Sequence, residues 1–495
     1  MGDEVAQRAY TREERQRYRK RVRECLDVFE QMLAHASFDF EKPLTGLEIE
    51  LNLVNADFAP AMANAAVLDV IADPDYQTEL GQYNIELNVS PRPLSGDNPL
   101  ELEELLRKSL NHAEAQANSV GAHIVAIGIL PTLTPENFHN DWMSANPRYA
   151  MLNEAVFAAR GEDLFIDIAN PDYEGERLAM YADTIAPESA CTSVQLHLQV
   201  SPQEFAASWN AAQALVGPQL ALGANSPYFF GKQLWAETRT ELFLQATDTR
   251  SVELKNQGVR PRVFFGERWI TSIFDLFEEN VRYFPALLPE STQEDPAAVL
   301  AAGDAPKLQE LRLHNGTVYR WNRPVYDLVG GLPHLRVENR VLPAGPTVVD
   351  TVANALFYYG VSRVLSSEDR PIWTKMSFDA AAHNFTEGAR RGISASLYWP
   401  GHGELPADEL VLRRLLPLAA EGLHRWGVSQ EAIDRYLPII EARCTGSVNG
   451  ASWQIDAVQA FERRGADRRT ALRQMLELYT QQMHANIPVH EWERP

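Results

Sequence analysis

The sequence predicts an α+β fold in which helices cover the back of one curved sheet and the concave face of that sheet lines a polar cavity. Three observations carry this prediction. Four stretches alternate between apolar and polar residues, which is the period of a half-buried strand. Their polar faces carry the same kinds of side chain although the stretches lie far apart in the sequence. Segments with helical periodicity separate them.

The first alternating stretch, residues 46–53, carries the clearest chemical signal. Glu48, Glu50 and Asn52 alternate with apolar residues, so two carboxylates and an amide share one face of the strand. Like charges stacked along a strand repel each other, and a divalent cation bound over them relieves the repulsion. Oxygen ligands of this kind suit Mg²⁺ or Mn²⁺. An ordinary acidic strand without a metal is the alternative.

The other three alternating stretches add carboxylate, imidazole, amide and guanidinium groups to the same face of the sheet. Their polar side chains are Asn84, Glu86 and Asn88 in residues 83–89, Ser193, Gln195, His197 and Gln199 in residues 193–200, and Arg336, Glu338 and Arg340 in residues 334–341. Because the opposite faces are apolar, we expect all of these groups to point into the cavity.

Helices and one buried strand complete the expected fold. Helical periodicity predicts helices over residues 10–36 and 99–118, and Thr347 is expected to cap a helix that runs to about residue 366. An apolar run at residues 123–128 predicts a buried strand. From about residue 408 onward, apolar stripes predict a mostly helical chain.

No internal repeat or linker-like segment divides the chain. The sequence therefore predicts one catalytic α+β domain over residues 10–400, with a helical C-terminal portion over residues 401–495 packed on the same domain. Residues 1–9 are expected to form a disordered tail. The sequence leaves open whether the helical portion also packs on a second copy of the chain to form a homo-oligomer.

Composition excludes several classes of partner. The formal net charge of −22 argues against nucleic-acid and membrane partners, because both select basic surfaces. The sequence has no apolar segment typical of a signal peptide and no run long enough to span a membrane. Three widely spaced cysteines, without a CxxC pair, fit a reducing compartment. We therefore expect a cytoplasmic protein that acts on small molecules.

The mixture of charges on the polar face indicates nucleotide chemistry. Several carboxylates can hold Mg²⁺, and nearby arginines can bind phosphate oxygens bidentately, which together fit a nucleoside triphosphate. Arg239, Arg320 and Arg323 could each pair with a substrate carboxylate or with a phosphate. A structural ion-pair network is the alternative for all of these groups. The sequence contains no Walker GxxxxGK[ST], GxGxxG, GxSxG or HExxH motif.

An ordered set of short motifs resembles the glutamate–cysteine ligase family, and most closely its carboxylate–amine ligase type. The resemblance runs from about residue 44 to about residue 455. The motifs are Gly46-x-Glu48-x-Glu50, the strand bearing Glu86, Thr192-Ser193-x-Gln195-x-His197, Asn225-Ser226-Pro227, Glu237-x-Arg239, and Glu338-x-Arg340 followed by Leu342-Pro343.

The resemblance implies a fold, a set of cofactors and a reaction. The expected fold is related to that of glutamine synthetase, with a bent, mostly antiparallel sheet that forms a funnel-shaped active site. The expected cofactors are ATP and Mg²⁺, or Mn²⁺ in its place. The expected reaction joins an amino-acid carboxylate to an amine through an acyl phosphate. Neither step requires a nucleophilic cysteine, so Cys191 is interpreted as structural.

The resemblance also implies roles for individual residues, by position in the motifs. The implied catalytic residues are Glu50, Arg340, which would hold the transferring phosphate, and Arg239, which would hold the α-carboxylate of the acceptor amino acid. The implied metal ligands are Glu48, Glu50, Glu86, Glu338 and His197. The implied nucleotide-binding residues are His197, Gln195, Arg336, Arg320 and Arg340. The implied substrate-binding residues are Arg239, Asn225, Glu237 and Tyr319.

The leading hypothesis is therefore glutamate–cysteine ligation, which produces γ-glutamylcysteine. The segment 314–324 and the long helical C-terminal portion are not shared by every branch of the family, so the identity of the amine stays open. Three alternatives remain. The chain could join glutamate or another amino acid to a different amine, it could phosphorylate a guanidino group or another amine, or it could bind ATP without turnover.

Overall fold

The computed structural model describes residues 10–35, 38–40, 43–139, 141–172 and 175–495. The tail expected at residues 1–9 lies outside the described residues. Of the helices described, none combines the length and the apolar composition that crossing a bilayer requires.

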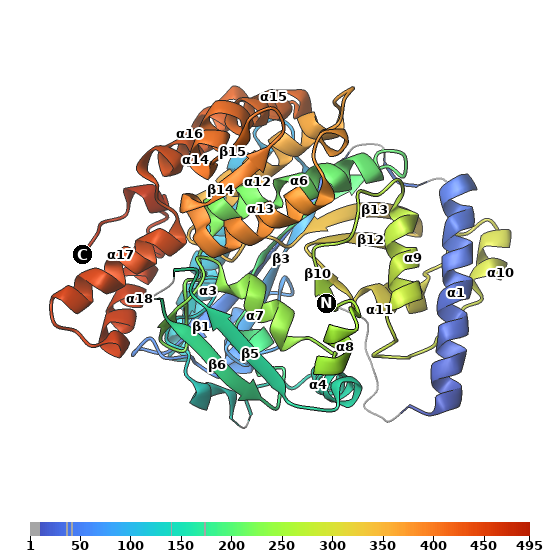
Figure 1. The fold of residues 1–495 in the computed structure, drawn as a ribbon, viewed down its shortest axis with the longest axis horizontal. Coiled ribbons are helices and arrows are strands. Elements are labelled where there is room, and N and C mark those ends of the chain that lie inside the picture. The colour runs from blue at the N-terminus through green and yellow to red at the C-terminus, as the bar shows by residue number, and fades with distance from the viewer. Residues whose placement is uncertain (1–9, 36–37, 41–42, 140, 173–174) are drawn as a thin grey trace.

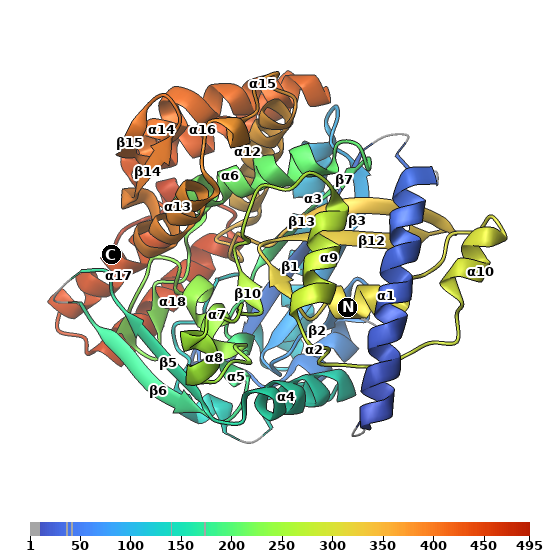
Figure 2. The same ribbon diagram turned by 45° about the vertical axis from the view of Figure 1, so that its right-hand side comes forward.

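A curled, seven-stranded sheet runs through the centre of the molecule (Figures 1 and 2). Every neighbouring pair in it is antiparallel, and the order is β12-β13-β7-β1-β3-β2, with β4 paired to the far end of β1. The strands are β1 (Leu44–Val54), β2 (Tyr76–Thr78), β3 (Asn84–Pro93), β4 (His123–Val125), β7 (Val194–Val200), β12 (Asn322–Val329) and β13 (Leu332–Asn339). The predicted fold class is confirmed.

All four alternating stretches form strands of this one sheet, but two details of the prediction are wrong. The strand expected at residues 123–128 ends at Val125, because the following groups bond elsewhere: the carbonyl of Ile127 accepts hydrogen bonds from Asn52 and Thr192. Arg340 lies just beyond the end of β13, where its backbone N–H donates to the carbonyl of Trp321.

Three long helices cover the apolar back of the sheet: α3 (Asn98–Ser119), α6 (Phe205–Gly223) and α12 (Val348–Ser366). Side chains of two of them bond directly to sheet backbone. The Tyr359 hydroxyl of α12 donates to the carbonyl of His197, and the Trp209 indole of α6 donates to the carbonyl of Asn322. Because the back is covered in this way, the polar face of the central strands is left to line a cavity.

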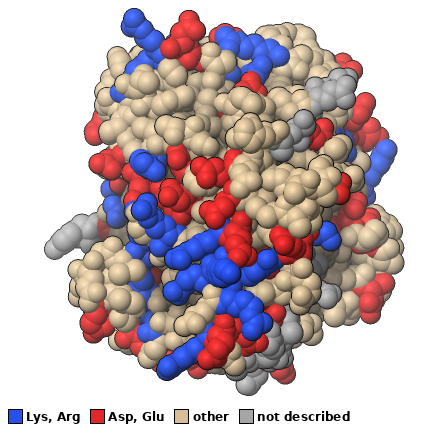
Figure 3. Space-filling view, turned by 90° about the vertical axis from the view of Figure 1, so that its right-hand side faces the viewer, with Lys and Arg blue, Asp and Glu red and all other residues tan. Residues whose placement is uncertain are grey.

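The N-terminal helix, α1 (Arg12–His35), packs beside β12 together with α9 (Ile273–Tyr283), α10 (Pro296–Ala301) and α11 (Gln309–Asn315) (Figures 1 and 2). Phe29 of α1 makes edge-on ring contacts with Phe277 and Tyr326. The opposite face of the helix is basic and exposed, and Figure 3 shows Lys and Arg gathered on this side of the molecule. Its exposed cations are Arg12, Arg15, Arg17, Arg19, Lys20 and Arg23.

The C-terminal helices stack on α12. Gly360 of α12 and Gly422 of α15 lie where the two helix backbones touch, and a Cβ atom at either position would collide with the facing backbone. A π-helical turn, Val411–Leu415, joins α14 to α15. The elements are α14 (Ala407–Leu410), α15 (Leu416–Trp426), α16 (Gln430–Gly446), α17 (Gly450–Arg463) and α18 (Arg468–His484).

Shorter elements surround the rim of the sheet. The remaining helices are α2 (Asn64–Ile71), α4 (Pro147–Arg160), α5 (Ala186–Ser189), α7 (Thr238–Ala246), α8 (Val252–Asn256) and α13 (Phe378–Arg391). The two-stranded ribbons are β5 (Leu164–Ala169) with β6 (Arg177–Ala182), β8 (Tyr228–Phe229) with β9 (Lys232–Gln233), β10 (Val263–Phe264) with β11 (Tyr319–Arg320), and β14 (Ser396–Trp399) with β15 (Gly403–Pro406).

A buried ion pair joins α12 to α16 and predicts a large loss of stability when it is broken. Arg443 donates to Asp350 (Nη2···Oδ1 2.6 Å) and to Asn354 (2.6 Å), and the Arg443 and Asp350 side chains are 1% and 0% exposed. Arg443→Met leaves a buried carboxylate without its cation, which costs about 3–5 kcal/mol. We expect a fall in thermal unfolding midpoint of several degrees. Arg413→Ala removes an exposed partner of Glu409 and should change the unfolding midpoint little.

The buried histidine of α11 predicts a loss of stability toward acid pH. Burial lowers the pKa of His314 to about 4, although its Nε2 lies 2.8 Å from the carbonyl oxygen of Asn280. Below an ordinary pKa of about 6.5, the unfolded chain binds a proton that the folded protein does not bind, so stability present above that pH is lost as the pH falls. Between pH 7 and pH 5 this residue should cost about 2 kcal/mol.

The measurement is the unfolding midpoint of wild type and His314→Gln at both pH values, with the exposed His402→Gln as the matched control. The His314 variant should lose less stability than wild type on acidification, and the His402 variant should follow wild type. An equal loss in all three proteins would contradict the assignment.

Candidate active site

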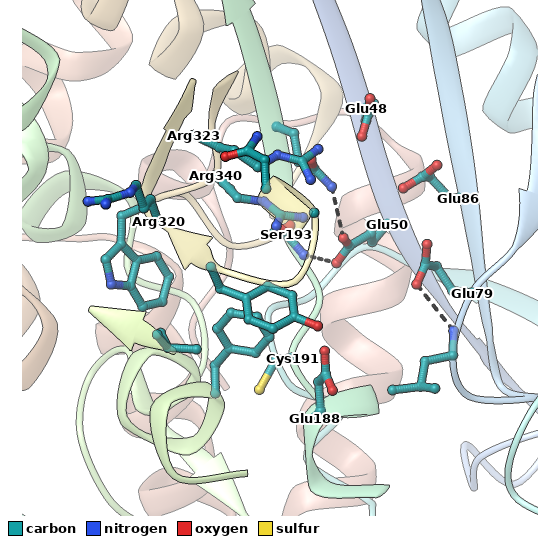
Figure 4. Close-up of a pocket in the computed structure, with 18 of the residues that line it drawn as sticks. Glu48, Glu50, Glu79, Glu86, Glu188, Cys191, Ser193, Arg320, Arg323 and Arg340 are labelled. Carbon is teal, nitrogen blue, oxygen red and sulfur yellow. Dashed lines mark hydrogen bonds between the residues drawn. The ribbon is translucent and has the colours of Figure 1, made fainter. Parts of the chain in front are cut away.

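A polar cavity of about 340 Å³ lies against the polar face of the sheet (Figure 4). Strands β1, β3 and β7 form one wall, and residues of α4, α5, α7, α11 and the 319–323 segment close the other sides. This volume is in the range of small-molecule sites. The lining is rich in carboxylates and guanidinium groups, so the site suits a charged ligand.

Four carboxylates enter the cavity from the same side (Figure 4). Strand register sets this arrangement, because Glu50 of β1 lies directly opposite Glu86 of β3, and Glu48 lies opposite Gln195 of β7. Glu79 joins them from the residue that follows β2. Glu50 is anchored by the backbone N–H of Ser193 (2.6 Å) and by the Gln195 amide (3.2 Å).

These carboxylates raise one another's proton affinity. Burial, followed by repulsion from Glu48 and Glu50, raises the pKa of Glu86 to about 7. Burial, followed by repulsion from Glu86 and Glu50, raises the pKa of Glu79 well above its usual range. Burial also raises the pKa of Glu50 although Arg340 opposes the shift. Such a cluster is favourable only when protons or a cation neutralise it.

A magnesium ion fits this donor set. Within the described ranges, no three His, Cys, Asp or Glu side chains converge closely enough to hold a metal without other ligands. Mg²⁺ commonly takes only one or two carboxylates and completes its shell with water and substrate phosphates. Glu48, Glu50, Glu79 and Glu86 supply hard oxygen donors of that kind in one cavity. The fit therefore rests on the chemistry of the donors that line the cavity.

Two arginines face the carboxylates from the opposite side (Figure 4). Arg323 donates to Glu338 (Nη2···Oε2 2.6 Å), and Nε of Arg340 lies 3.2 Å from Oε1 of the same carboxylate. Glu338 is fully buried, yet Arg323 and Arg340 overcome the burial and hold its pKa well below the usual range. This fixed anion orients both guanidinium groups toward the cavity.

A chain of polar contacts connects β13, β7 and β1 beneath the cavity. Arg336 donates through Nε to Nδ1 of His197 (3.1 Å), and Nε2 of His197 lies 3.1 Å from Oε1 of Glu48. Since Nδ1 accepts a hydrogen bond, the proton of a neutral ring is on Nε2, facing the carboxylate. Burial tends to raise the pKa of Glu48, but the contact with His197 outweighs burial and the pKa is lowered.

The 319–321 segment contributes one cavity wall and one structural arginine. Tyr319 lines the cavity, and burial raises the pKa of its hydroxyl well above the usual range. Arg320 is also at the cavity surface, but its guanidinium donates to Glu279 (2.9 Å) and Asn280 (3.0 Å). Figure 4 shows Arg320 directed away from the carboxylates, so its charge is committed to α9.

Arg239 lines the cavity at its far wall. Its Nε donates to Glu237 (2.8 Å), it also donates to the carbonyl of Val341, and it lies over the Trp321 ring at 5.6 Å. Glu237 is fully buried and in turn accepts from the backbone N–H of Asn225 (2.8 Å). This buried pair holds the arginine in place at the cavity wall.

The predicted site residues divide into three groups. Glu48, Glu50, Glu86, Gln195, Arg239, Tyr319, Arg320, Arg336 and Arg340 line the cavity together. His197 and Glu338 lie buried in the sheet beneath it and contact lining residues. Asn225 and Glu237 are not in the lining; the Asn225 amide donates to the carbonyl of Ala344 and to the Tyr479 hydroxyl (both 2.8 Å).

Sequence reasoning missed several lining residues, of which Glu79, Glu188, Asp327, Arg148 and Arg312 carry charge. Glu79 follows a strand of three residues, too short to show alternation, and Glu188 lies on a helix of four residues. The one available signal was the position of Glu79 seven residues before Glu86 in a polar segment, and by itself it indicates nothing specific.

Cys191 also lines the cavity, and its thiol contacts two backbone carbonyl oxygens. Sγ lies 3.8 Å from the carbonyl oxygen of Pro187 and 3.7 Å from that of Arg239, within reach of weak hydrogen bonds. Burial raises the pKa of Cys191 well above its usual range, so the group stays a neutral thiol. This agrees with a structural cysteine rather than a nucleophile.

Comparisons with known proteins agree with the fold. The family model for glutamate–cysteine ligase family 2 (GCS2) matches residues 44–438. Glutamate–cysteine ligase from Francisella tularensis, solved in complex with AMP, has a TM-score of 0.53 at 14% identity, covering 90% of each chain. A bifunctional glutathione synthetase from Pasteurella multocida has a TM-score of 0.51 at 13% identity, covering 93% of this chain and 55% of that chain. No curated protein matches significantly.

At these low identities the two solved structures show a shared fold and nothing finer. The family match spans most of the chain, and it includes β1, β3, β7 and β13, which carry the charged wall of the cavity. The chain therefore belongs to glutamate–cysteine ligase family 2, a family of ATP-dependent carboxylate–amine ligases.

Proposed function

We propose that this protein joins the side-chain carboxylate of glutamate to the amine of cysteine, with hydrolysis of ATP to ADP and phosphate, and so forms γ-glutamylcysteine. The observation that supports the proposal best is the opposition of Glu48, Glu50 and Glu86 to Arg323 and Arg340 across one cavity. A metal–triphosphate complex carries both kinds of charge that such walls attract.

The carboxylate wall is proposed to hold Mg²⁺ through Glu48, Glu50, Glu79 and Glu86. When bound, Mg²⁺ neutralises phosphate charge and so makes transfer of the terminal phosphoryl group easier. Glu50 has a further role that its contacts support: the Ser193 N–H and the Gln195 amide fix its carboxylate before any ligand enters.

Arg340 and Arg323 are proposed to bind the phosphoryl group as it moves from ATP to the glutamate carboxylate. A free carboxylate is a poor electrophile, whereas the acyl phosphate formed by this transfer can be attacked by an amine. Phosphoryl transfer needs positioning and charge neutralisation more than covalent help from the protein. Glu338 supports this role, because its fixed contacts with both arginines limit their motion.

The amino-acid substrates are proposed to lie beside Arg239 and Tyr319. Arg239 presents a permanent positive charge at the cavity wall, which suits an α-carboxylate. An acyl phosphate must meet the amine before water reaches it, and a cavity enclosed on several sides favours that order of events. The choice of glutamate and cysteine rests on the family, and a different amine would use the same chemistry.

The first test is ADP release with ATP, Mg²⁺ and glutamate, with and without cysteine, and with product masses recorded. We expect cysteine-dependent turnover that yields γ-glutamylcysteine. Glu50→Gln and Arg340→Ala should each lower kcat by at least about 100-fold, since each removes preorganised charge from the phosphoryl-transfer site. Arg413→Ala, which changes only an exposed residue of the helical C-terminal region, should retain full activity.

The outcomes separate the alternatives. Turnover with another amine in a panel would keep the ligase chemistry and replace cysteine as substrate. A stable phosphorylated amine or guanidino product would indicate a kinase. ATP binding without turnover on any pair of substrates would contradict an active ligase.

A further inference from the structure

Glu188 is a charged cavity residue that the chemistry described so far does not use. It lies on α5, a helix of four residues whose other members, Ala186, Pro187 and Ser189, are buried. The Ser189 hydroxyl bonds to the carbonyl of Ala186 (2.7 Å) and to the Tyr83 hydroxyl (2.9 Å). The backbone that carries Glu188 is therefore rigid, and its side chain points into the cavity (Figure 4).

The Glu188 carboxyl group has no fixed partner among the described residues. Its Oε2 atom is buried and accepts no hydrogen bond, unlike the two oxygens of Glu50. A buried acceptor without a partner is costly, and such groups at a ligand site commonly bind a donor on the ligand. The structure thus offers an unused proton acceptor inside the cavity.

The charged surroundings of Glu188 favour a proton that moves on and off near neutral pH. The groups close enough to influence it are Arg340, Glu50, Tyr319 and Cys191. Burial raises the pKa of Glu188 to about 8, although Arg340 opposes the shift. The raised pKa brings the Glu188 carboxyl group closer to that of an amino-acid ammonium group, which favours proton transfer between the two.

Ligation creates a need for such an acceptor. An amino-acid amine enters the site mainly as an ammonium ion, which has no lone pair and cannot attack an acyl phosphate. Arg239, Arg323 and Arg340 cannot take the proton, because guanidinium groups are already protonated. Of the other lining carboxylates, Glu48, Glu50, Glu79 and Glu86 are proposed to hold metal, and Asp327 is ion-paired with Arg312 and Arg336.

Resting on the proposed ligase function, we propose that Glu188 is the general base that deprotonates the incoming ammonium group. The carboxylate of Glu188 takes one proton from the ammonium, which leaves a neutral amine. The amine nitrogen then forms a bond to the acyl carbon, the bond from that carbon to the phosphate oxygen breaks, and inorganic phosphate leaves. The second nitrogen proton passes to the departing phosphate, and Glu188 returns its own proton to water when products leave.

Hydroxylamine provides the test, because it is a much weaker base than an amino-acid amine and is largely neutral at neutral pH. It attacks acyl phosphates directly and yields a hydroxamate, so it needs no general base. In Glu188→Gln, we expect cysteine-dependent kcat to fall by at least about 100-fold, the usual contribution of a general base. Hydroxamate formation from glutamate and ATP should stay within about threefold of wild type.

Two measurements on variants test whether the loss belongs to proton transfer. Glu50→Gln should lose cysteine-dependent turnover and hydroxamate formation alike, because it acts before the acyl phosphate exists. Glu188→Gln should keep or raise the thermal unfolding midpoint of wild type, because it replaces a buried carboxyl group by a neutral group of the same shape. The fold of the variant is thereby checked independently of activity.

Other results would overturn the assignment. Equal losses with cysteine and hydroxylamine in Glu188→Gln would place the residue in phosphoryl transfer or in structure. A higher KM for cysteine with unchanged kcat would make it a binding residue only, and unchanged kinetics would remove it from the reaction. If wild type formed neither amide nor hydroxamate with any acid, the ligase proposal itself would fail, which is distinguishable from failure of Glu188 alone.

Discussion

Repulsion between carboxylates at the centre of the sheet is the constraint on which the rest of the structure depends. Glu50 and Glu86 lie directly opposite each other on paired strands, and Glu48 and Glu79 add negative charge beside them. Such pairs destabilise a sheet. The apolar back, covered by α3, α6 and α12, has to supply the stability that this face lacks. The arrangement persists because strand register, once fixed by that back, allows no other placement of Glu48, Glu50 and Glu86.

On the other side of the cavity, arginines compensate the burial of a carboxylate by pairing with it. Glu338 has two guanidinium partners and a strongly lowered pKa, whereas Glu86 has no guanidinium partner in the described part of the chain and its pKa is raised. Two glutamates of one polar face therefore differ in the chemistry available to them. Glu338 is neutralised within the protein and acts through Arg323 and Arg340. Glu86 remains available for a ligand that carries positive charge. One wall of the cavity therefore has its charge balanced within the protein, and the other needs a positively charged ligand to balance its charge.

Sequence reasoning found the parts of the site that periodicity determines. Glu48, Glu50, Glu86 and Gln195 lie on alternating strands, and an apolar opposite face fixes where such side chains point. Glu79 and Glu188 could not be predicted from periodicity. Glu79 follows a three-residue strand and Glu188 lies on a single helical turn, and in such short elements only tertiary packing decides where a side chain points. Asn225 and Glu237 show the converse. Both occur in motifs of the family, yet their polar groups bond to protein atoms outside the cavity lining, and a sequence does not distinguish a polar group bonded to protein from one bonded to ligand.

The thiol of Cys191 has a consequence for redox behaviour. Only a thiolate attacks a disulfide or is readily oxidised, and the raised pKa of Cys191 keeps its sulfur protonated. A small disulfide that entered this cavity would therefore not be attacked by Cys191, and no mixed disulfide would block the site. The same property protects the side chain from peroxide, since oxidation follows thiolate character and exposure. Cys191 is thus not a route by which oxidants or disulfides would inactivate the cavity.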